Sequence, residues 1–227
     1  MTMPTTLLTG PVAPLAGSDA TSAIAKTPVT APLWLGAEGL QGDAQADRRV
    51  HGGPEKALHH YPWDHYAAWR ADLGSLPLLD APGAFGENIS VAGLTEDGVA
   101  VGDIFRLGGA LVQVSQGRQP CWKLNHRLGV PDMARRVQDT GRTGWYYRVL
   151  QPGMVAPGDD LALIDRLTPD WTLRRLWRAM YVDRLNRAEL EAIAALDVLA
   201  KGWRRYAQRR LDSGRVEDWR PRLEGQA

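Results

Sequence analysis

Hydrophobic and polar positions follow two different patterns along the chain. From Ser22 to about Arg166, short apolar runs rich in β-branched and aromatic residues alternate with turns that contain Gly and Pro. Runs of this length and composition predict β-strands. Many short strands within one stretch favour a barrel or a sandwich over a layered α/β sheet. The strands expected in this way are Ser22–Val29, Val99–Leu107, Ala110–Gln116, Gly144–Leu150 and Leu161–Leu167.

Two helices are predicted to interrupt these strands. Trp63–Leu73 begins directly after a proline, and its residues Tyr66 and Trp69 are spaced to share one helical face. Asp132–Asp139 carries an apolar stripe and is followed by a glycine, which is typical of helix ends. The first ~15 residues, rich in Thr, Pro and Gly, are expected to form a loose arm.

From Thr168 onward the apolar spacing becomes helical. Helices as short as those expected here are not stable alone, so they should pack on one another or on the barrel. Asn186 is placed to cap the second of them. The three predicted helices are Trp171–Val182, Arg187–Ala200 and Gly202–Leu211.

The change of pattern predicts two domains. Residues 1–166 should form a mainly β, barrel-like domain with interspersed helices, and residues 167–227 a C-terminal three-helix domain. The chain has 227 residues, 44% of them hydrophobic, which is enough to bury the core of one large domain with a small appendage.

Composition also narrows the location of the protein. No apolar run reaches the ~18 residues that a membrane-spanning helix needs. The first residues lack the basic start and the apolar stretch of a secretory signal. The single cysteine excludes an intramolecular disulfide and a multi-cysteine metal site, so we expect a cytoplasmic protein.

The charge balance gives little support to nucleic-acid binding. The formal net charge is only +1. Residues 168–227 contain 13 Lys and Arg against 9 Asp and Glu, whereas residues 1–167 contain 14 against 17. We interpret the basic excess as a solvated helical face and expect no stable nucleic-acid binding. A nucleic-acid-associated protein that uses the basic helices is the alternative.

Cys121 stands in a segment with several chemically useful residues. Gly117 and Pro120 predict a loop after the preceding strand, which presents the thiol close to Arg118 and Lys123. Nearby cations favour the thiolate, the form that attacks electrophiles and binds soft metals. The alternative is an inert, half-buried cysteine, because free cysteines behave mostly as small hydrophobic residues.

Two further segments combine glycine with polar side chains. Val50–Lys56 contains paired glycines whose N–H groups can approach a ligand, and its lysine and the preceding arginines are suited to phosphate. In Phe85–Ile89, Glu87 and Asn88 offer a carboxylate and an amide that can hold the edge of a heterocycle. Plain turn formation is the alternative for both segments.

These segments together resemble the MOSC domain family, named after the C-terminal part of molybdenum cofactor sulfurases. The resemblance covers essentially the whole chain from about residue 20 and includes a C-terminal three-helix module. The residues that carry it are, in order, Ser22–Lys26, Gly39–Asp43, Val50–Pro54, His60–Pro62, Phe85–Asn88, Val101–Asp103, Gln116–Leu124 and Arg209–Leu211.

The resemblance implies a MOSC-type β-barrel that binds a molybdenum cofactor, a molybdopterin carrying Mo. It gives Cys121 the role of molybdenum ligand and catalytic residue. The candidates that it implies for binding the pterin or phosphate of the cofactor are Arg118, Lys123, Asn125, His51, Lys56 and Asn88.

The activity implied by the resemblance is the reduction of N-hydroxylated compounds to amines. Substrates of this class include amidoximes and N-hydroxylated nucleobases such as 6-N-hydroxylaminopurine. The reaction removes one oxygen as water and uses two electrons and two protons, which suits a redox-active metal. Without a flavin, haem or iron–sulfur motif, electrons are expected from a separate reductase.

Two points stay open at this stage. A non-catalytic carrier of the molybdenum cofactor, or of sulfur as a Cys121 persulfide, is the alternative to the reductase. The resemblance is also compatible with a homodimer, and the sequence pattern does not decide the oligomeric state.

Overall fold

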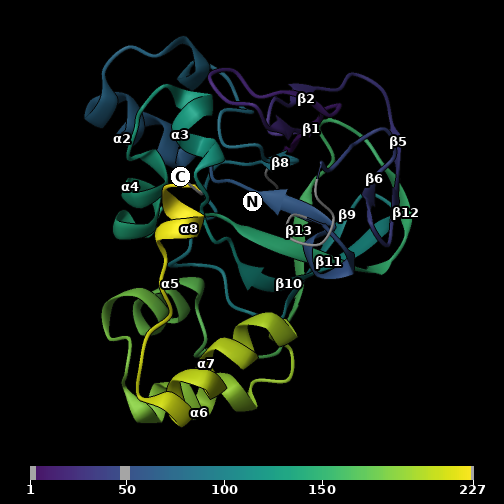
Figure 1. Ribbon diagram of the computed structural model, residues 1–227. Helices are drawn as coiled ribbons and strands as arrows, with labels where there is room; N and C mark the ends of the chain where they lie inside the picture. The colour runs from purple at the N-terminus through teal and green to yellow at the C-terminus, as the bar shows by residue number, and fades with distance from the viewer. Residues whose placement is uncertain (1–3, 47–51, 226–227) are drawn as a thin grey trace.

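The computed structural model describes residues 4–46 and 52–225 (Figure 1). Its largest element is a curled sheet of eight strands, in the order β13-β9-β10-β11-β7-β8-β1-β4. β7 and β8 pair in parallel, and the other neighbouring pairs among the described residues are antiparallel. The strands are β1 (Thr6–Thr9), β4 (Thr27–Pro28), β7 (Leu58–His60), β8 (Ile89–Ser90), β9 (Asp103–Leu107), β10 (Ala110–Gly117), β11 (Trp145–Gln151) and β13 (Leu161–Arg166).

The curled sheet forms a half-barrel, which confirms the mainly β fold with interspersed helices. Two smaller sheets accompany it: β12 (Gly153–Val155), β5 (Leu33–Gly36) and β6 (Gly39–Leu40) form one, and β2 (Ala13–Pro14) and β3 (Thr21–Ser22) form the other. The helices of this region are α2 (Asp64–Leu73), α3 (Lys123–Leu128) and α4 (Met133–Thr140), together with the short 3₁₀ turns η1 (Pro54–Lys56) and η2 (Pro77–Leu79).

Two expectations for this region were wrong in detail, and one helix was not predicted. The expected strand Ser22–Val29 is mostly irregular, with only the ends of this stretch paired in β3 and β4. The expected loose arm contains β1, which pairs with both β8 and β4 and buries Leu7 and Leu8 completely. Helix α3 was not predicted, and it begins only two residues after Cys121.

The C-terminal helices agree with the predicted three-helix module. α5 (Leu173–Trp177) continues as a π-helical turn, η3 (Arg178–Val182), and is followed by α6 (Arg187–Ala195) and α7 (Lys201–Ser213). The Asn186 side chain caps α6 by accepting the N–H of Glu189 at 3.2 Å, as predicted. A fourth short helix, α8 (Arg220–Leu223), was not predicted.

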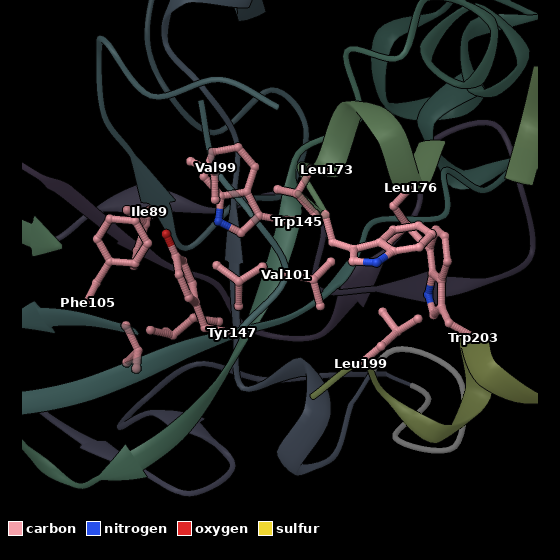
Figure 2. Close-up of a cluster of buried hydrophobic side chains, with 14 of the residues drawn as sticks. Ile89, Val99, Val101, Phe105, Trp145, Tyr147, Leu173, Leu176, Leu199 and Trp203 are labelled. Atoms are coloured by element: carbon pink, nitrogen blue, oxygen red, sulfur yellow. The ribbon is translucent and has the colours of Figure 1, made fainter. Parts of the chain in front are cut away.

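The helical module and the sheet share one hydrophobic core. Figure 2 shows Trp145 and Val101 of the sheet region in the same cluster as Leu176 and Trp203 of the helices. All four side chains are buried. The helices therefore pack directly on the half-barrel. No helix among the described residues combines the length and apolar character needed to cross a membrane.

Candidate functional site

An open cavity lies on the half-barrel. Segments that are far apart in the sequence build its wall. Five residues singled out from the sequence line it: Cys121, Arg118, Lys123, Lys56 and Asn88. The fold therefore brings these candidates together.

The thiol of Cys121 is held in a short loop between two regular elements. This loop, residues 118–122 (the Cys121 loop), connects the end of β10 to the start of α3. The buried Leu124 anchors α3 in a second hydrophobic cluster, and its N–H donates to the Cys121 carbonyl at 3.0 Å. Cys121 itself is half-buried and is one of the residues that line the cavity.

Arg118 presents a buried cation with unused hydrogen-bonding capacity. Its side chain is 5% exposed, and its Nη2 donates to the Phe85 carbonyl at 3.3 Å. Its Nη1 is buried and has no hydrogen-bond partner among residues 4–46 and 52–225. A buried guanidinium N–H is costly to leave unpaired, so this atom is suited to an anionic or polar ligand in the cavity.

A second buried cation, Lys26, is paired with a carboxylate of the cavity wall. Its Nζ forms an ion pair with Asp43, and both side chains are almost fully buried. Burial lowers the pKa of the Lys26 ammonium, and the charge of Asp43 and its hydrogen bond act in the opposite direction. We expect the pair to hold its charges because each partner compensates the other.

Asn88 supports this ion pair through hydrogen bonds of its side chain. Its amide Nδ2 donates to the carboxylate of Asp43 at 2.8 Å and to the Leu8 carbonyl at 3.2 Å, and its Oδ1 accepts the N–H of His59 at 3.1 Å. The amide is thus committed to the wall of the cavity.

Glu87, the other polar residue of this turn, is engaged inside the protein. Its carboxylate accepts the N–H of Gly83 at 2.7 Å and that of Phe85 at 3.0 Å, and also the hydroxyl of Tyr66. Burial raises the pKa of the Glu87 carboxyl, while these donors lower it. For Glu87 the structure therefore agrees with the turn-forming alternative.

Two lysines flank the thiol side of the cavity. The Lys56 ammonium lies 5.9 Å from the centroid of the Tyr146 ring, and burial lowers its pKa, whereas the nearby Cys121 thiol raises it. Lys123 donates from Nζ to the Thr21 carbonyl at 3.0 Å. The described lining thus carries four cationic side chains and one carboxylate, which favours an anionic ligand.

Asn125, a candidate for contact with the cofactor, is not among the residues that line the cavity. Its Nδ2 donates to the Leu223 carbonyl at 3.0 Å, and its Oδ1 accepts the N–H of Ala134 at 2.8 Å. Through these two hydrogen bonds the Asn125 side chain connects α3 to α4 and to the C-terminal segment. The remaining candidate, His51, lies outside the described residues.

Three wall residues received no role from the sequence. Lys26 and Asp43 belong to segments that carried the family resemblance, but they are 17 residues apart and no local pattern pairs them. Tyr146 was part of a predicted strand, and its place in that strand gave no indication that its ring lies beneath Lys56.

Comparison with known proteins identifies the family. Residues 47–162 match the MOSC domain, and residues 171–214 match the YiiM-like, 3-alpha helix domain. Protein YiiM of Escherichia coli (strain K12) is 44% identical over 208 residues, which span 90% of this chain and 91% of YiiM. The crystal structure of YiiM from Escherichia coli gives a TM-score of 0.85 at 36% identity, covering 99% of this chain and 100% of that chain.

A third relative carries a functional name. A protein named "Reductase" from Gibberella moniliformis (strain M3125 / FGSC 7600) is 40% identical over 165 residues. The match spans 72% of this chain but only 29% of the fungal protein. The family match over half of the chain and the extended identity to YiiM lead to one conclusion: this chain belongs to the MOSC domain family.

Proposed function

We propose that this chain is a molybdenum-cofactor-dependent reductase of N-hydroxylated compounds, with Cys121 as the molybdenum ligand. The observation that carries the proposal is a half-buried cysteine in a cation-lined cavity of a MOSC-family chain. The fungal relative named as a reductase supports the reaction class. A cytoplasmic location belongs to the same proposal, because the ligand must stay a reduced thiol.

The residues of the cavity fit such a cofactor. Cys121 offers the soft sulfur ligand that molybdenum accepts. The Nη1 of Arg118, which has no hydrogen-bond partner among the described residues, can donate to a phosphate or a pterin edge. Lys56 and Lys123 add positive charge to the described lining and would compensate the negative charge of a phosphorylated pterin. Asn88 acts indirectly, by fixing Asp43 against Lys26.

When bound, the cofactor supplies the two-electron redox chemistry that the protein side chains lack. The overall reaction converts R–NHOH, two electrons and two protons to R–NH₂ and water. The protein binds the cofactor through its cations, orients the substrate in the open part of the cavity and limits water around the thiol. Electrons come from a separate reductase in this proposal.

The test is purification from a molybdenum-replete host, followed by metal and pterin analysis and an activity assay. The assay supplies a reduced dye as electron donor and benzamidoxime or 6-N-hydroxylaminopurine as substrate. We expect stoichiometric molybdenum and formation of the amine. Bound cofactor without turnover would favour the carrier alternative, and a protein free of both molybdenum and pterin would contradict the proposal.

A further inference from the structure

The chain returns to the half-barrel after the three-helix module and ends its described part against the Cys121 loop. Figure 1 shows α8 beside α3 and α4, away from α6 and α7. Leu223 of α8 is 2% exposed and belongs to the buried core. Residues 215–225 lie outside both stretches that match the family domains. The role of α8 must therefore be inferred from this chain's own contacts.

The contacts of α8 hold the peptide groups on both sides of Cys121. On one side, Arg222 donates from Nη1 to the Pro120 carbonyl at 2.5 Å. On the other side, the Trp122 N–H donates to the Arg222 carbonyl at 2.8 Å. One residue of α8 thus fixes the carbonyl before the cysteine and the amide after it.

Arg222 also ties this arrangement to a rigid helix. Its Nη2 donates to Oε1 of Gln138 at 2.5 Å, and Gln138 is a buried residue of α4. The neighbouring Leu223 carbonyl accepts Nδ2 of Asn125, the contact that accounts for the position of Asn125 outside the cavity. The guanidinium therefore joins the Cys121 loop, α4 and α8 at a single point.

The Cys121 loop has few other restraints of its own. Pro120 has no N–H to donate, and the loop lies outside the regular ladder of the sheet. Its other backbone hydrogen bonds within the described residues are Arg118 N–H to the Gly144 carbonyl, Leu124 N–H to the Cys121 carbonyl and Asn125 N–H to the Trp122 carbonyl. Loss of α8 would remove the hydrogen bonds that Arg222 makes to the Pro120 carbonyl and to the Trp122 N–H.

We infer that Arg222 is a positioning residue that holds the Cys121 thiol in place from the C-terminal segment. This inference rests on the proposed function in one respect, since the position of the thiol matters only if Cys121 binds a ligand. Arg222 does not line the cavity and acts through the loop.

The test measures the thiol itself, in the full-length protein prepared without molybdenum. Cys121 is the only cysteine, so its rate of alkylation by iodoacetamide reports one site. We expect Arg222→Ala to accelerate alkylation by about fivefold, because the loop loses the hydrogen bond to the Pro120 carbonyl and the thiol becomes more exposed. Arg222→Lys should restore part of the wild-type rate, since an ammonium can still donate to the Pro120 carbonyl.

The matched control is Arg220→Ala, on the same short helix. Arg220 is exposed and pairs with Asp218, two residues away, rather than with the loop. We expect wild-type alkylation from this variant. A wild-type rate in Arg222→Ala, or equal acceleration in the Arg220→Ala control, would overturn the inference.

Hydrogen exchange of the unaltered protein gives a second test that does not depend on the variants folding. Peptides that cover residues 118–122 and 219–225 should show matching protection, because each supplies hydrogen bonds to the other. A fast-exchanging C-terminal peptide beside a protected loop would contradict the inference. Failure of the reductase proposal has a different signature, namely a wild-type protein without molybdenum or turnover whose thiol rate still responds to Arg222.

Discussion

In the proposed function, the sulfur atom of Cys121 is the molybdenum ligand that the protein provides. Serine is nearly isosteric with cysteine, and the residue is half-buried, so Cys121→Ser should cost about 1 kcal/mol or less in stability. A serine hydroxyl stays protonated near neutral pH and is a hard ligand that holds molybdenum poorly. We expect this variant to keep its melting temperature, lose molybdenum and show no amidoxime reduction.

Two results would change this picture of Cys121. Turnover close to that of the wild type would exclude the residue as the metal ligand. An unfolded variant would show that the side chain is needed for packing, as in the inert-cysteine alternative. The molybdenum-to-protein ratio and the melting temperature, measured on the same preparation, separate these cases.

His60 makes the stability of the fold depend on pH. Burial lowers the pKa of its imidazole to about 3, and the charge of His65 acts in the same direction. In the unfolded chain the pKa is about 6.5, so between these values the unfolded state binds one more proton than the folded state. The contribution of His60 to the free energy of unfolding is complete above pH ~6.5. It is lost as the pH falls toward 3, by up to about 1.4 kcal/mol per pH unit.

Replacement of His60 should therefore make the free energy of unfolding less dependent on pH in the acidic range. We expect His60→Gln to be destabilised at pH 7, because the hydrogen bond between His60 Nδ1 and the Tyr147 hydroxyl, 3.0 Å long, is altered. Its further loss of stability between pH 6 and 4 should be smaller than that of the wild type. Urea unfolding at several pH values measures the free energy of unfolding of the variant and of the wild type. An identical dependence of this free energy on pH in both proteins would contradict the role of His60.

At the scale of elements, the long segments were predictable and the short ones were not. β10, β11 and the helices α2 and α4 extend over enough residues for a periodic pattern to appear. β3, β4 and β8 have two residues each, and their pairing depends on neighbours distant in the sequence. β1 lies in a stretch rich in Thr, Pro and Gly, and its pairing with β8 and β4 could not be seen from the local sequence.

The candidate site shows the same division. Arg118, Cys121 and Lys123 were found because they lie within one short motif. The Lys26–Asp43 pair could not be found, because it forms only when two loops meet. The direction of the Asn125 amide could not be predicted, because proximity to Cys121 in the sequence does not fix the side of α3 on which it lies.

Gly144 directly precedes β11 and contacts the backbone of Arg118, and it cannot easily be replaced. Its φ is 70°, and an added Cβ would lie 2.3 Å from the His60 carbonyl oxygen. Its own carbonyl accepts the N–H of Arg118. We expect Gly144→Ala to cost the ~1–2 kcal/mol of a left-handed residue and about 1–3 kcal/mol more for the clash.

Gly129 provides the matched control for this prediction. Its φ is 66°, but an added Cβ would meet no atom within 4 Å. Gly129→Ala should therefore show only the backbone cost. Urea midpoints of the two variants measure the difference, and equal midpoints would mean that the backbone around Gly144 relaxes to accommodate a methyl group.

At the scale of the whole molecule, the shared core predicts cooperative unfolding. Trp145 of the sheet and Trp203 of α7 belong to one buried cluster, so neither part can lose its structure without exposing apolar surface of the other. We expect tryptophan fluorescence and far-ultraviolet circular dichroism to report one coincident urea transition. Two separated transitions would show that the half-barrel and the helical module unfold independently.

The position of α8 has a consequence for the order of events during synthesis. Residues 220–225 leave the ribosome after every strand of the sheet, and the earlier parts of a chain generally fold first. The lining of the cavity is thus complete before the segment that restrains the Cys121 loop has emerged. Under the function proposed above, a cofactor that reached the chain during this interval would meet a less restrained Cys121 loop than the one in the finished fold.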